Sequence, residues 1–394
     1  MNPTDWFPLL DAFQIEIPSW GFADTGTRFG KFPQPAAAAT IEEKIEDAAR
    51  VNQLTGACPT MAVHVLWDFK EGADPREVAQ LAQKHGIKIG SINPNLFQNA
   101  EYKYGSAASP NAEARKMAHQ HVLDCIEIGE QTGSSLLSFW FADGINYPGQ
   151  DDLIARKHRL ESALMEWHDA MPDNMTMLVE YKPFEPAFYA TDSADWGMAT
   201  LLCRKAGPRA KVLVDTGHHL PATNVEQIVA WLLDEDLLGG FHFNDSKYAD
   251  DDLTLGSIDP YAVFRIFHEI RNAAERGVDV EKIAYMIDQS HNLKPKMEAM
   301  IQTVATAQEL YLKACLVDRE ALRKFQKACD IVGAEECLRR AFYADVSPIL
   351  QAWRQSKGLP ADPLQAHRES NYTEEKAAER SARRPKDSGG SSYA

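Results

Sequence analysis

Short apolar segments, many of them rich in β-branched residues, alternate with longer amphipathic segments from residue 15 to residue 290. Eight of the short segments have the length and composition of strands. Most are apolar on both faces, which is typical of strands covered by helices. They lie at 15–20, 61–68, 87–92, 135–141, 175–182, 211–216, 239–244 and 283–288.

Helical patterns fill the intervals between these strands and also follow the last of them. Several begin at a capping residue or at proline, such as Asn111, Asn224 or Pro260. The intervals hold predicted helices at 40–55, 75–85, 111–132, 152–171, 192–206, 224–234 and 260–276. Four further helical segments follow at 295–317, 318–332, 334–342 and 344–357.

Eight successive strand–helix units predict an α/β fold, a (β/α)8 TIM barrel with a C-terminal helical extension. An open doubly wound sheet is the alternative, but no Gly-x-Gly-x-x-Gly motif follows the first strand. We expect a catalytic barrel domain over residues 1–300. Residues 301–394 are expected to form helices that contact other subunits, ending in a flexible polar tail.

Charge and composition narrow the class of partner. The net charge of −16 argues against a nucleic-acid partner, because phosphate binding needs a basic surface. No apolar run approaches the roughly 18 residues of a membrane span, and the N-terminus lacks a signal-peptide pattern. The six scattered cysteines include no Cys-x-x-Cys pair and indicate reduced thiols. We therefore expect a cytoplasmic protein that acts on a small molecule.

Polar residues gather at the carboxyl ends of the last four predicted strands, where a barrel carries its active site. Each of these residues, considered alone, could have a purely structural role in a salt bridge, as a hydrogen-bonded histidine or in a solvated acidic turn. Four successive strand ends of this kind favour a metal centre. Carboxylates mixed with imidazoles suit Mn, Co or Mg, and the absence of cysteine disfavours structural zinc. The residues are Glu180, Lys182, Asp215, His218, His219, His242, Asp250, Asp251, Asp252 and Asp288.

The segments EYKPFEP, DTGHH, FHFNDSKYADDDL and MIDQSHN resemble L-rhamnose isomerases and, more distantly, xylose isomerases. The resemblance runs through nearly the whole chain, from PSWGFADTGTRF (18–29) to LVDREAL (316–322). It implies an aldose–ketose isomerase that converts L-rhamnose to L-rhamnulose by a metal-mediated hydride shift, assembled as a homotetramer. Removal of the C2 proton by a protein carboxylate, the enediol route, is the alternative mechanism.

The same resemblance implies a site with two divalent ions, Mn²⁺ first and Co²⁺ or Mg²⁺ as alternatives. One ion would take Glu180, Asp215, His242 and Asp288, and the other would take Asp215, His218, Asp250 and Asp252. Catalytic roles fall to Lys182, Asp288, His218 and Asp250. The sugar would contact Trp20, His64 and Trp140, residues whose spacing alone is equally consistent with packing in the core.

Two positions depart from the family pattern. Tyr181 stands where the family often has His, and its side chain is expected to point away from Glu180 and Lys182. Trp67 stands where xylose isomerases have the Asp that orients the strand-two His. A related epimerase, a metal-dependent hydrolase and a metal-stabilised sugar-binding protein remain the alternative functions.

Overall fold

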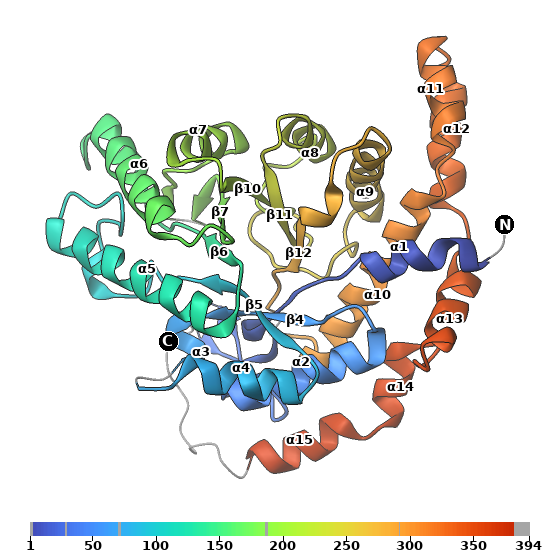
Figure 1. The fold of residues 1–394 in the computed structure, drawn as a ribbon, viewed down its shortest axis with the longest axis horizontal. Helices are drawn as coiled ribbons and strands as arrows, with labels where there is room; N and C mark the ends of the chain where they lie inside the picture. The colour runs from blue at the N-terminus through green and yellow to red at the C-terminus, as the bar shows by residue number, and fades with distance from the viewer. Residues whose placement is uncertain (1–2, 28–29, 70–71, 186–187, 291, 382–394) are drawn as a thin grey trace.

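Eight parallel strands form the centre of the molecule, in the order β1-β4-β5-β6-β7-β10-β11-β12 (Figure 1). The computed structural model describes residues 3–27, 30–69, 72–185, 188–290 and 292–381. The strands are β1 (Ile17–Pro18), β4 (Thr60–His64), β5 (Lys88–Asn93), β6 (Leu136–Phe139), β7 (Thr176–Glu180), β10 (Ala210–Asp215), β11 (Leu238–Phe243) and β12 (Ala284–Ile287). Each lies within or close to a predicted strand, because runs buried on both faces leave a strong apolar signal.

The first and last strands meet at Glu16, which forms an isolated parallel bridge with Met286. The Glu16 backbone N–H donates to Tyr285 at 2.8 Å, and its carbonyl accepts from Ile287 at 2.9 Å. These bonds join β1 to β12, so the sheet forms a ring. The predicted (β/α)8 barrel is confirmed.

One helix of the outer ring follows each strand in the described part of the chain. Asparagine and aspartate side chains cap most of these helices, and left-handed Gly56 and Gly133 end two of them. The ring consists of α2 (Ile41–Thr55), α4 (Pro75–Lys84), α5 (Ala112–Thr132), α6 (Leu153–Ala170), α7 (Trp196–Ala206), α8 (Val225–Asp234), α9 (Pro260–Glu275) and α10 (Lys296–Cys315).

Some predicted elements differ in extent from the observed ones. The strand predicted at 15–20 stops at Pro18, because Ser19–Phe22 turn into the 3-10 helix η2. The strand predicted at 61–68 stops at His64, and Val65–Asp68 form the short helix α3. Two hairpins that the pattern did not predict, β2–β3 (Gly26–Thr27 and Gly30–Lys31) and β8–β9 (Phe184–Glu185 and Tyr189–Ala190), lie in loops after β1 and β7.

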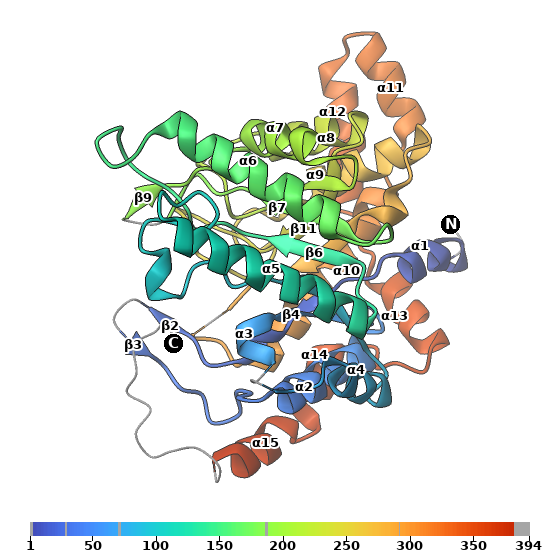
Figure 2. The ribbon, with the colours of Figure 1, turned by 60° about the vertical axis from the view of Figure 1, so that its left-hand side comes forward.

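The chain after α10 leaves the barrel and then returns to it. Helices α11 (Arg319–Lys327) and α12 (Ile331–Phe342) form a hairpin that projects from the body (Figures 1 and 2). Helices α13 (Ser347–Ser356), α14 (Pro363–Glu369) and α15 (Tyr372–Ser381) run back toward α2. Residue 300, the expected end of the barrel domain, lies inside α10. The polar tail is expected within residues 362–394, and residues 382–394 lie outside the described part of the chain.

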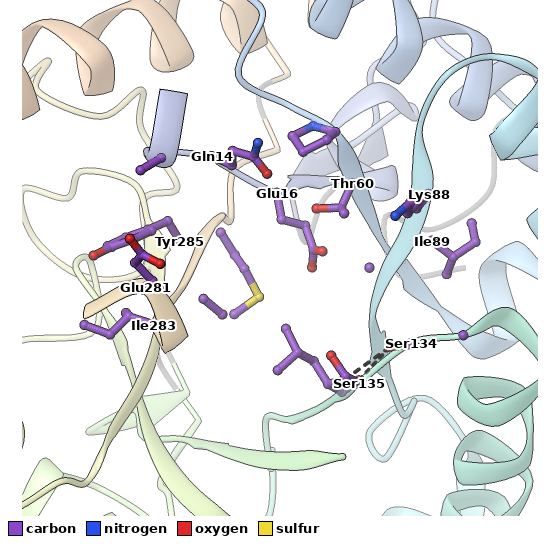
Figure 3. Close-up of a pocket in the computed structure, with 17 residues that line it drawn as sticks. Gln14, Glu16, Thr60, Lys88, Ile89, Ser134, Ser135, Glu281, Ile283 and Tyr285 are labelled. Carbon is purple, nitrogen blue, oxygen red and sulfur yellow. Dashed lines mark hydrogen bonds between the residues drawn. The ribbon is translucent and has the colours of Figure 1, made fainter. Parts of the chain in front are cut away.

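The amino ends of the strands surround a cavity of about 360 Å³ (Figure 3). The carboxylate of Glu16 lies in this region and accepts the backbone N–H of Ser91 at 2.9 Å. Burial raises the pKa of Glu16. A Cβ atom at position 90 would lie 1.5 Å from this carboxylate, so Gly90 makes room for it. A buried carboxylate thus lies near the amino ends of the strands, apart from the polar residues at their carboxyl ends.

None of the helices described in the structure is both long enough and apolar enough to span a membrane.

Candidate metal centre and sugar site

Four potential ligands project from the carboxyl ends of four neighbouring strands. Glu180 ends β7, Asp215 ends β10, His242 lies in β11 and Asp288 directly follows β12. One atom of each lies within 4.8 Å of the others, and this is the one such group found among the described residues. The imidazole Nδ1 of His242 is 3.2 Å from Glu180 Oε2 and 3.6 Å from Asp288 Oδ2.

The charges in this cluster shift one another's titration, because the groups are close together and largely buried. Asp215 is 0% exposed, and Glu180 and His242 are each 3% exposed. Burial, together with the charges of Glu180 and Asp288, raises the pKa of Asp215 to about 7. Burial also opposes ionisation of Glu180, but His242 and His218 hold its pKa at about 2. The carboxylates and His242 therefore depend on one another's charge.

The residues present fit a divalent ion. Both ring nitrogens of His242 are buried and make no hydrogen bond, although Nδ1 has a carboxylate oxygen at 3.2 Å. Two side chains that ligate the same ion lie close together in this way, with no hydrogen bond between them. Three carboxylates with one imidazole suit Mn²⁺, Co²⁺ or Mg²⁺. This set equals the first ligand group expected from the sequence.

The second expected ligand group is adjacent to the first, but two of its members, His218 and Asp250, are paired with each other. His218 Nε2 lies 3.0 Å from Asp250 Oδ1, and His218 Nδ1 lies 3.0 Å from Glu180 Oε1. Asp252 has a left-handed backbone (φ 46°). Burial and the charges of Asp250, Asp288 and Asp215 raise its pKa. The loop after β11 thus brings two aspartates to the rim, where Asp250 pairs with cationic side chains.

Lys182 does not pair with Glu180, although the two side chains share a side of the strand. Its ammonium Nζ lies 2.5 Å from Asp250 Oδ2, 3.0 Å from Glu185 Oε2 and 4.8 Å from the centre of the Trp140 ring. Burial would lower the pKa of Lys182, but Asp250 and Glu185 raise it. Glu185 was absent from the predicted site, and its only signal was its place in the KPFEP segment.

The three predicted sugar contacts lie on a continuous aromatic wall. Trp20 packs 4.7 Å from His64, and Trp140 packs 5.0 Å from Phe97. Trp67 and Phe97, which sequence reasoning did not include, join the two halves: the His64 ring is 4.2 Å from Trp67 and 5.8 Å from Phe97. The wall is joined to the candidate metal ligands, because Trp20 Nε1 donates to Asp288 Oδ1 at 2.7 Å.

The two departures from the family pattern have clear structural outcomes. Tyr181 points away from Glu180 and Lys182, as expected, and its hydroxyl lies 2.6 Å from His219 Nε2. Asp68 accepts the backbone N–H of His64 at 2.8 Å, and His64 Nδ1 has no hydrogen-bond partner. Burial lowers the pKa of His64 to about 3, so its ring is neutral. Among the residues that the structure describes, no carboxylate is found bonded to this ring.

A model of the family described as "Xylose isomerase-like TIM barrel" matches residues 58–291, which include β4 to β12. The chain belongs to this xylose isomerase-like family. The matched residues contain Glu180, Asp215, His242 and Asp288.

Two curated relatives resemble the chain over most of its length. A protein of Mesorhizobium japonicum named "Probable sugar isomerase" is 41% identical over 95% of this chain and 87% of its own length. A protein of Rhizobium meliloti with the same description is 40% identical over 94% of this chain and 87% of its own. Both matches extend beyond the barrel into the helical extension.

Solved structures share the fold at low identity. An L-ribulose 3-epimerase covers 80% of this chain and 97% of its own, with a TM-score of 0.56 and 12% identity. A D-psicose 3-epimerase covers 72% of this chain and 93% of its own, with a TM-score of 0.51 and 14% identity. These likenesses show the barrel of the xylose isomerase-like family in other proteins and carry no conclusion about substrate.

Proposed function

We propose that this protein is a metal-dependent aldose–ketose isomerase with L-rhamnose as its first substrate, converted to L-rhamnulose by a hydride shift. The observation that carries the proposal is the buried cluster of Glu180, Asp215, His242 and Asp288 beside a lysine and an aromatic wall. Family membership and the two relatives support a sugar isomerase or epimerase. The finer assignment to L-rhamnose rests on the resemblance of the segments from EYKPFEP to MIDQSHN.

Two divalent ions, Mn²⁺ preferred, complete the proposed site. Glu180, Asp215, His242 and Asp288 would hold the first, and Asp215, His218, Asp250 and Asp252 the second. Bound there, a divalent ion acts as a Lewis acid toward the sugar's C1 and C2 oxygens. Asp250 would have to give up its present pairing with Lys182 and His218 to join the second ion.

The chain's own residues bind the sugar and handle charge and protons. Lys182, a buried cation at the rim, would stabilise negative charge that develops on the sugar's O1. The carboxylate of Asp250 or Asp288, with His218 beside Asp250, would take the proton from O2 and deliver it to O1 after the hydride has moved from C2 to C1. The wall of Trp20, His64 and Trp140 would pack against the apolar face of the sugar and keep water from the reacting carbons.

A 3-epimerase is the second candidate function, and one observation favours it. The described residues contain a single four-ligand cluster, and Asp250 is already paired with Lys182 and His218. A one-metal enzyme that exchanges the C3 proton of a ketose between two carboxylates needs no more than that cluster. Lys182 beside Trp140 favours the isomerase, because C3 epimerisation requires no cation next to O1.

Metal-restored turnover on a sugar panel tests the proposal. Protein treated with EDTA and reloaded with Mn²⁺ is assayed on L-rhamnose, L-mannose, L-lyxose, D-allose and D-xylose, and on D-fructose for C3 epimerisation. We expect ketose formation, fastest from L-rhamnose, and none without metal. A faster reaction with another aldose would move the substrate assignment. C3 epimerisation without aldose isomerisation would establish the second candidate, and no turnover with metal bound would defeat both.

Deuterium placed on C2 of the aldose separates the two isomerisation routes. A hydride shift carries the label to C1 of the product, whereas removal of a proton by a carboxylate exchanges it with solvent. We expect retention at C1, measured by NMR of the ketose. Extensive exchange with solvent would establish the enediol route.

We further infer a homotetramer with a barrel unit and a helical extension that makes subunit contacts. The projecting α11–α12 hairpin supports this inference, because Ile331, Val332 and Tyr343 are 70%, 71% and 72% exposed on it. Light scattering coupled to gel filtration is expected to give four times the monomer mass. A monomeric mass would overturn the inference.

A further inference from the structure

The backbone of Lys182 lies two residues beyond the end of β7, where the strand ladder no longer positions it. Instead, residues 191–193 hold it from both sides. The Lys182 N–H donates to the Ser193 carbonyl at 3.0 Å, and the Thr191 hydroxyl donates to the Lys182 carbonyl. Thr191 and Ser193 are both buried. The position of the Lys182 ammonium therefore depends on the position of residues 191–193.

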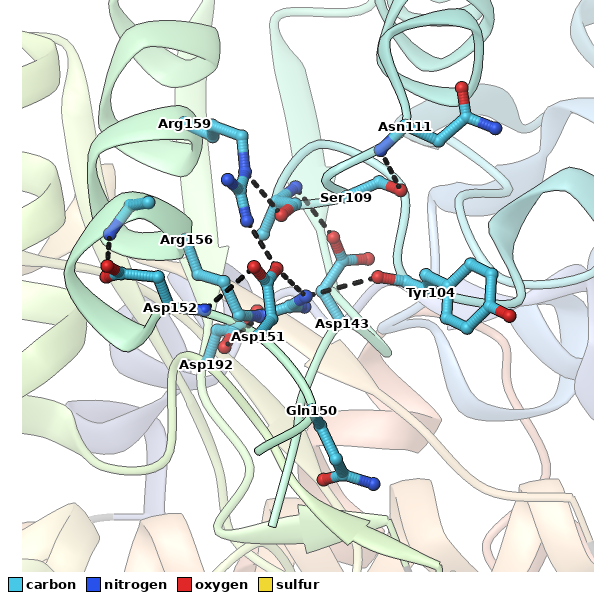
Figure 4. Close-up of polar contacts among 12 residues, drawn as sticks. Tyr104, Ser109, Asn111, Asp143, Gln150, Asp151, Asp152, Arg156, Arg159 and Asp192 are labelled. Carbon is cyan, nitrogen blue, oxygen red and sulfur yellow. Dashed lines mark hydrogen bonds and ion pairs between the residues drawn. The ribbon is translucent and has the colours of Figure 1, made fainter. Parts of the chain in front are cut away.

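Asp192, the middle residue of that segment, forms hydrogen bonds with Arg156 of α6 (Figure 4). Arg156 Nε donates to Asp192 Oδ1 at 3.0 Å, and Nη2 donates to Oδ2 at 2.7 Å. Two parallel bonds from a planar guanidinium fix both the distance and the rotation of a carboxylate. The Asp192 N–H adds a bond to the Asp143 carbonyl at 2.9 Å.

Arg156 also forms hydrogen bonds with the loops that follow β5 and β6. Its Nη1 donates to the Tyr104 carbonyl at 3.1 Å and to Asp151 at 3.2 Å. Asp143 accepts the backbone N–H groups of Ser106 and Ala108 at 2.7 to 2.8 Å. The loops that follow β5, β6 and β7 thus meet at one guanidinium.

A contribution to stability does not by itself explain why an arginine is buried at position 156. Its side chain is 1% exposed, and a buried ion pair is often replaceable by apolar residues without loss of stability. What an apolar replacement cannot supply is the fixed orientation of Asp192. We propose that Arg156 is a positioning residue that, through Asp192 and residues 191–193, keeps the Lys182 ammonium between Asp250 and Glu185 over Trp140. The catalytic half of this inference rests on the proposed function.

Hydrogen exchange tests the structural half without any need for turnover. Arg156→Met is compared with Arg159→Met, a matched change one turn along α6. Arg159 bonds to Asp151 and to the Ala108 carbonyl, and neither bond involves residues 191–193. We expect faster amide exchange across residues 181–185 and 188–193 in Arg156→Met and not in Arg159→Met. Unchanged exchange in Arg156→Met, or an equal increase in both variants, would overturn the inference. Asp192→Asn serves as the second variant if Arg156→Met does not fold.

Steady-state kinetics on the best sugar of the panel tests the catalytic half. Arg156→Met is expected to lower kcat by about 10- to 100-fold, the range that a displacement of about 1 Å produces, with little change in KM or in Mn²⁺ affinity. Arg156→Lys keeps the positive charge but cannot donate two parallel hydrogen bonds to Asp192, so its kcat is expected to remain low. Wild-type kcat in Arg156→Met, or an equal loss in Arg159→Met, would overturn the positioning role. If the wild type turns over no sugar, the proposed function fails, while the exchange result still decides the structural half.

Discussion

Trp20 connects the aromatic wall to the metal cluster through one side chain. Its indole N–H bonds to Asp288 at 2.7 Å, and its ring packs against His64. A residue that hydrogen-bonds a ligating carboxylate orients the ligand and tunes its basicity. At the residue scale, the wall and the candidate metal cluster are therefore one structure, and a change in Trp20 reaches Asp288.

Trp20→Phe is expected to weaken Mn²⁺ binding by about 10- to 100-fold, because Asp288 loses the donor that orients it. Calorimetric titration of EDTA-treated protein with Mn²⁺ gives the affinity. Trp140→Phe is the control, since Trp140 faces Lys182 and its buried indole N–H makes no hydrogen bond to any described residue. Equal metal affinity in Trp20→Phe and wild type would contradict the role of the indole N–H.

His268 on α9 is expected to make the fold less stable in mild acid. Burial, together with the charge of Arg319, lowers its pKa from 6.5 to about 4. The unfolded chain therefore takes up this proton at a higher pH than the folded protein does. The stability is complete above pH 6.5 and is lost as the pH falls toward 4, by at most about 3 kcal/mol.

Urea unfolding at pH 7.5 and pH 5 measures this loss for the wild type and for His268→Gln. The variant carries no imidazole, so its free energy of unfolding is expected to fall less between the two pH values. An identical fall in both proteins would show that His268 contributes nothing to the acid sensitivity.

At the scale of elements, one buried carboxylate joins the parts that carry the aromatic wall. Asp68 of α3 accepts the Lys44 ammonium of α2 at 2.6 Å and the Ser19 hydroxyl of η2 at 2.5 Å. It also accepts the backbone N–H of His64 at 2.8 Å. The Asp68 side chain therefore bonds to Ser19, the neighbour of Trp20, and to the backbone of His64.

Lys44→Met is expected to destabilise the protein by about 3 to 5 kcal/mol, because it leaves the Asp68 charge buried without a cation. Denaturant unfolding measures the change. Lys282→Met is the matched control, since Lys282 pairs with Asp279 on the exposed surface and its loss is expected to have no measurable effect. A Lys44→Met protein as stable as this control would contradict the expectation.

Most of the elements could be predicted because each buried strand leaves its own local apolar signal. The ends of β1 and β4 could not, because Asp68 of α3 bonds to Ser19 of η2 and to Lys44 of α2, which are distant from it in sequence. The same limit applies to the site. Its ligands share strand ends and resemble a known pattern, but the bond from Trp20 to Asp288 joins residues 268 positions apart. The pairing of Lys182 with Asp250 rather than Glu180 likewise depends on the path of a loop.

At the scale of the whole molecule, the last described helix closes over the first helix of the ring. Arg380 of α15 bonds to Asp47 of α2 at 2.8 and 2.9 Å, and the Tyr372 hydroxyl donates to the same carboxylate at 2.7 Å. Arg380 also donates to the Ala36 carbonyl at 2.6 Å. Asp47 is 1% exposed, so α15 supplies the partners of a charge that has no contact with solvent.

Removal of residues 372–394 is expected to lower the melting temperature, because Asp47 loses Tyr372 and Arg380 together. Asp47→Leu in the shortened protein is expected to recover part of the loss by removing the unpaired charge. Thermal unfolding of the full and shortened chains, each with and without Asp47→Leu, measures the coupling. Purely additive effects of truncation and substitution would show that Asp47 is not coupled to α15.

The bond between Asp47 and Arg380 spans 333 residues, and the bridge that joins β1 to β12 spans nearly the whole barrel. A ribosome that adds about 5 to 20 residues per second needs roughly 15 to 70 seconds to make the chain between those two residues. Until β12 and α15 have been made, β1 and α2 lack the contacts that these segments supply in the folded protein. The nascent N-terminal third is therefore open to chaperones and proteases for a time that translation speed determines, however stable the finished barrel is.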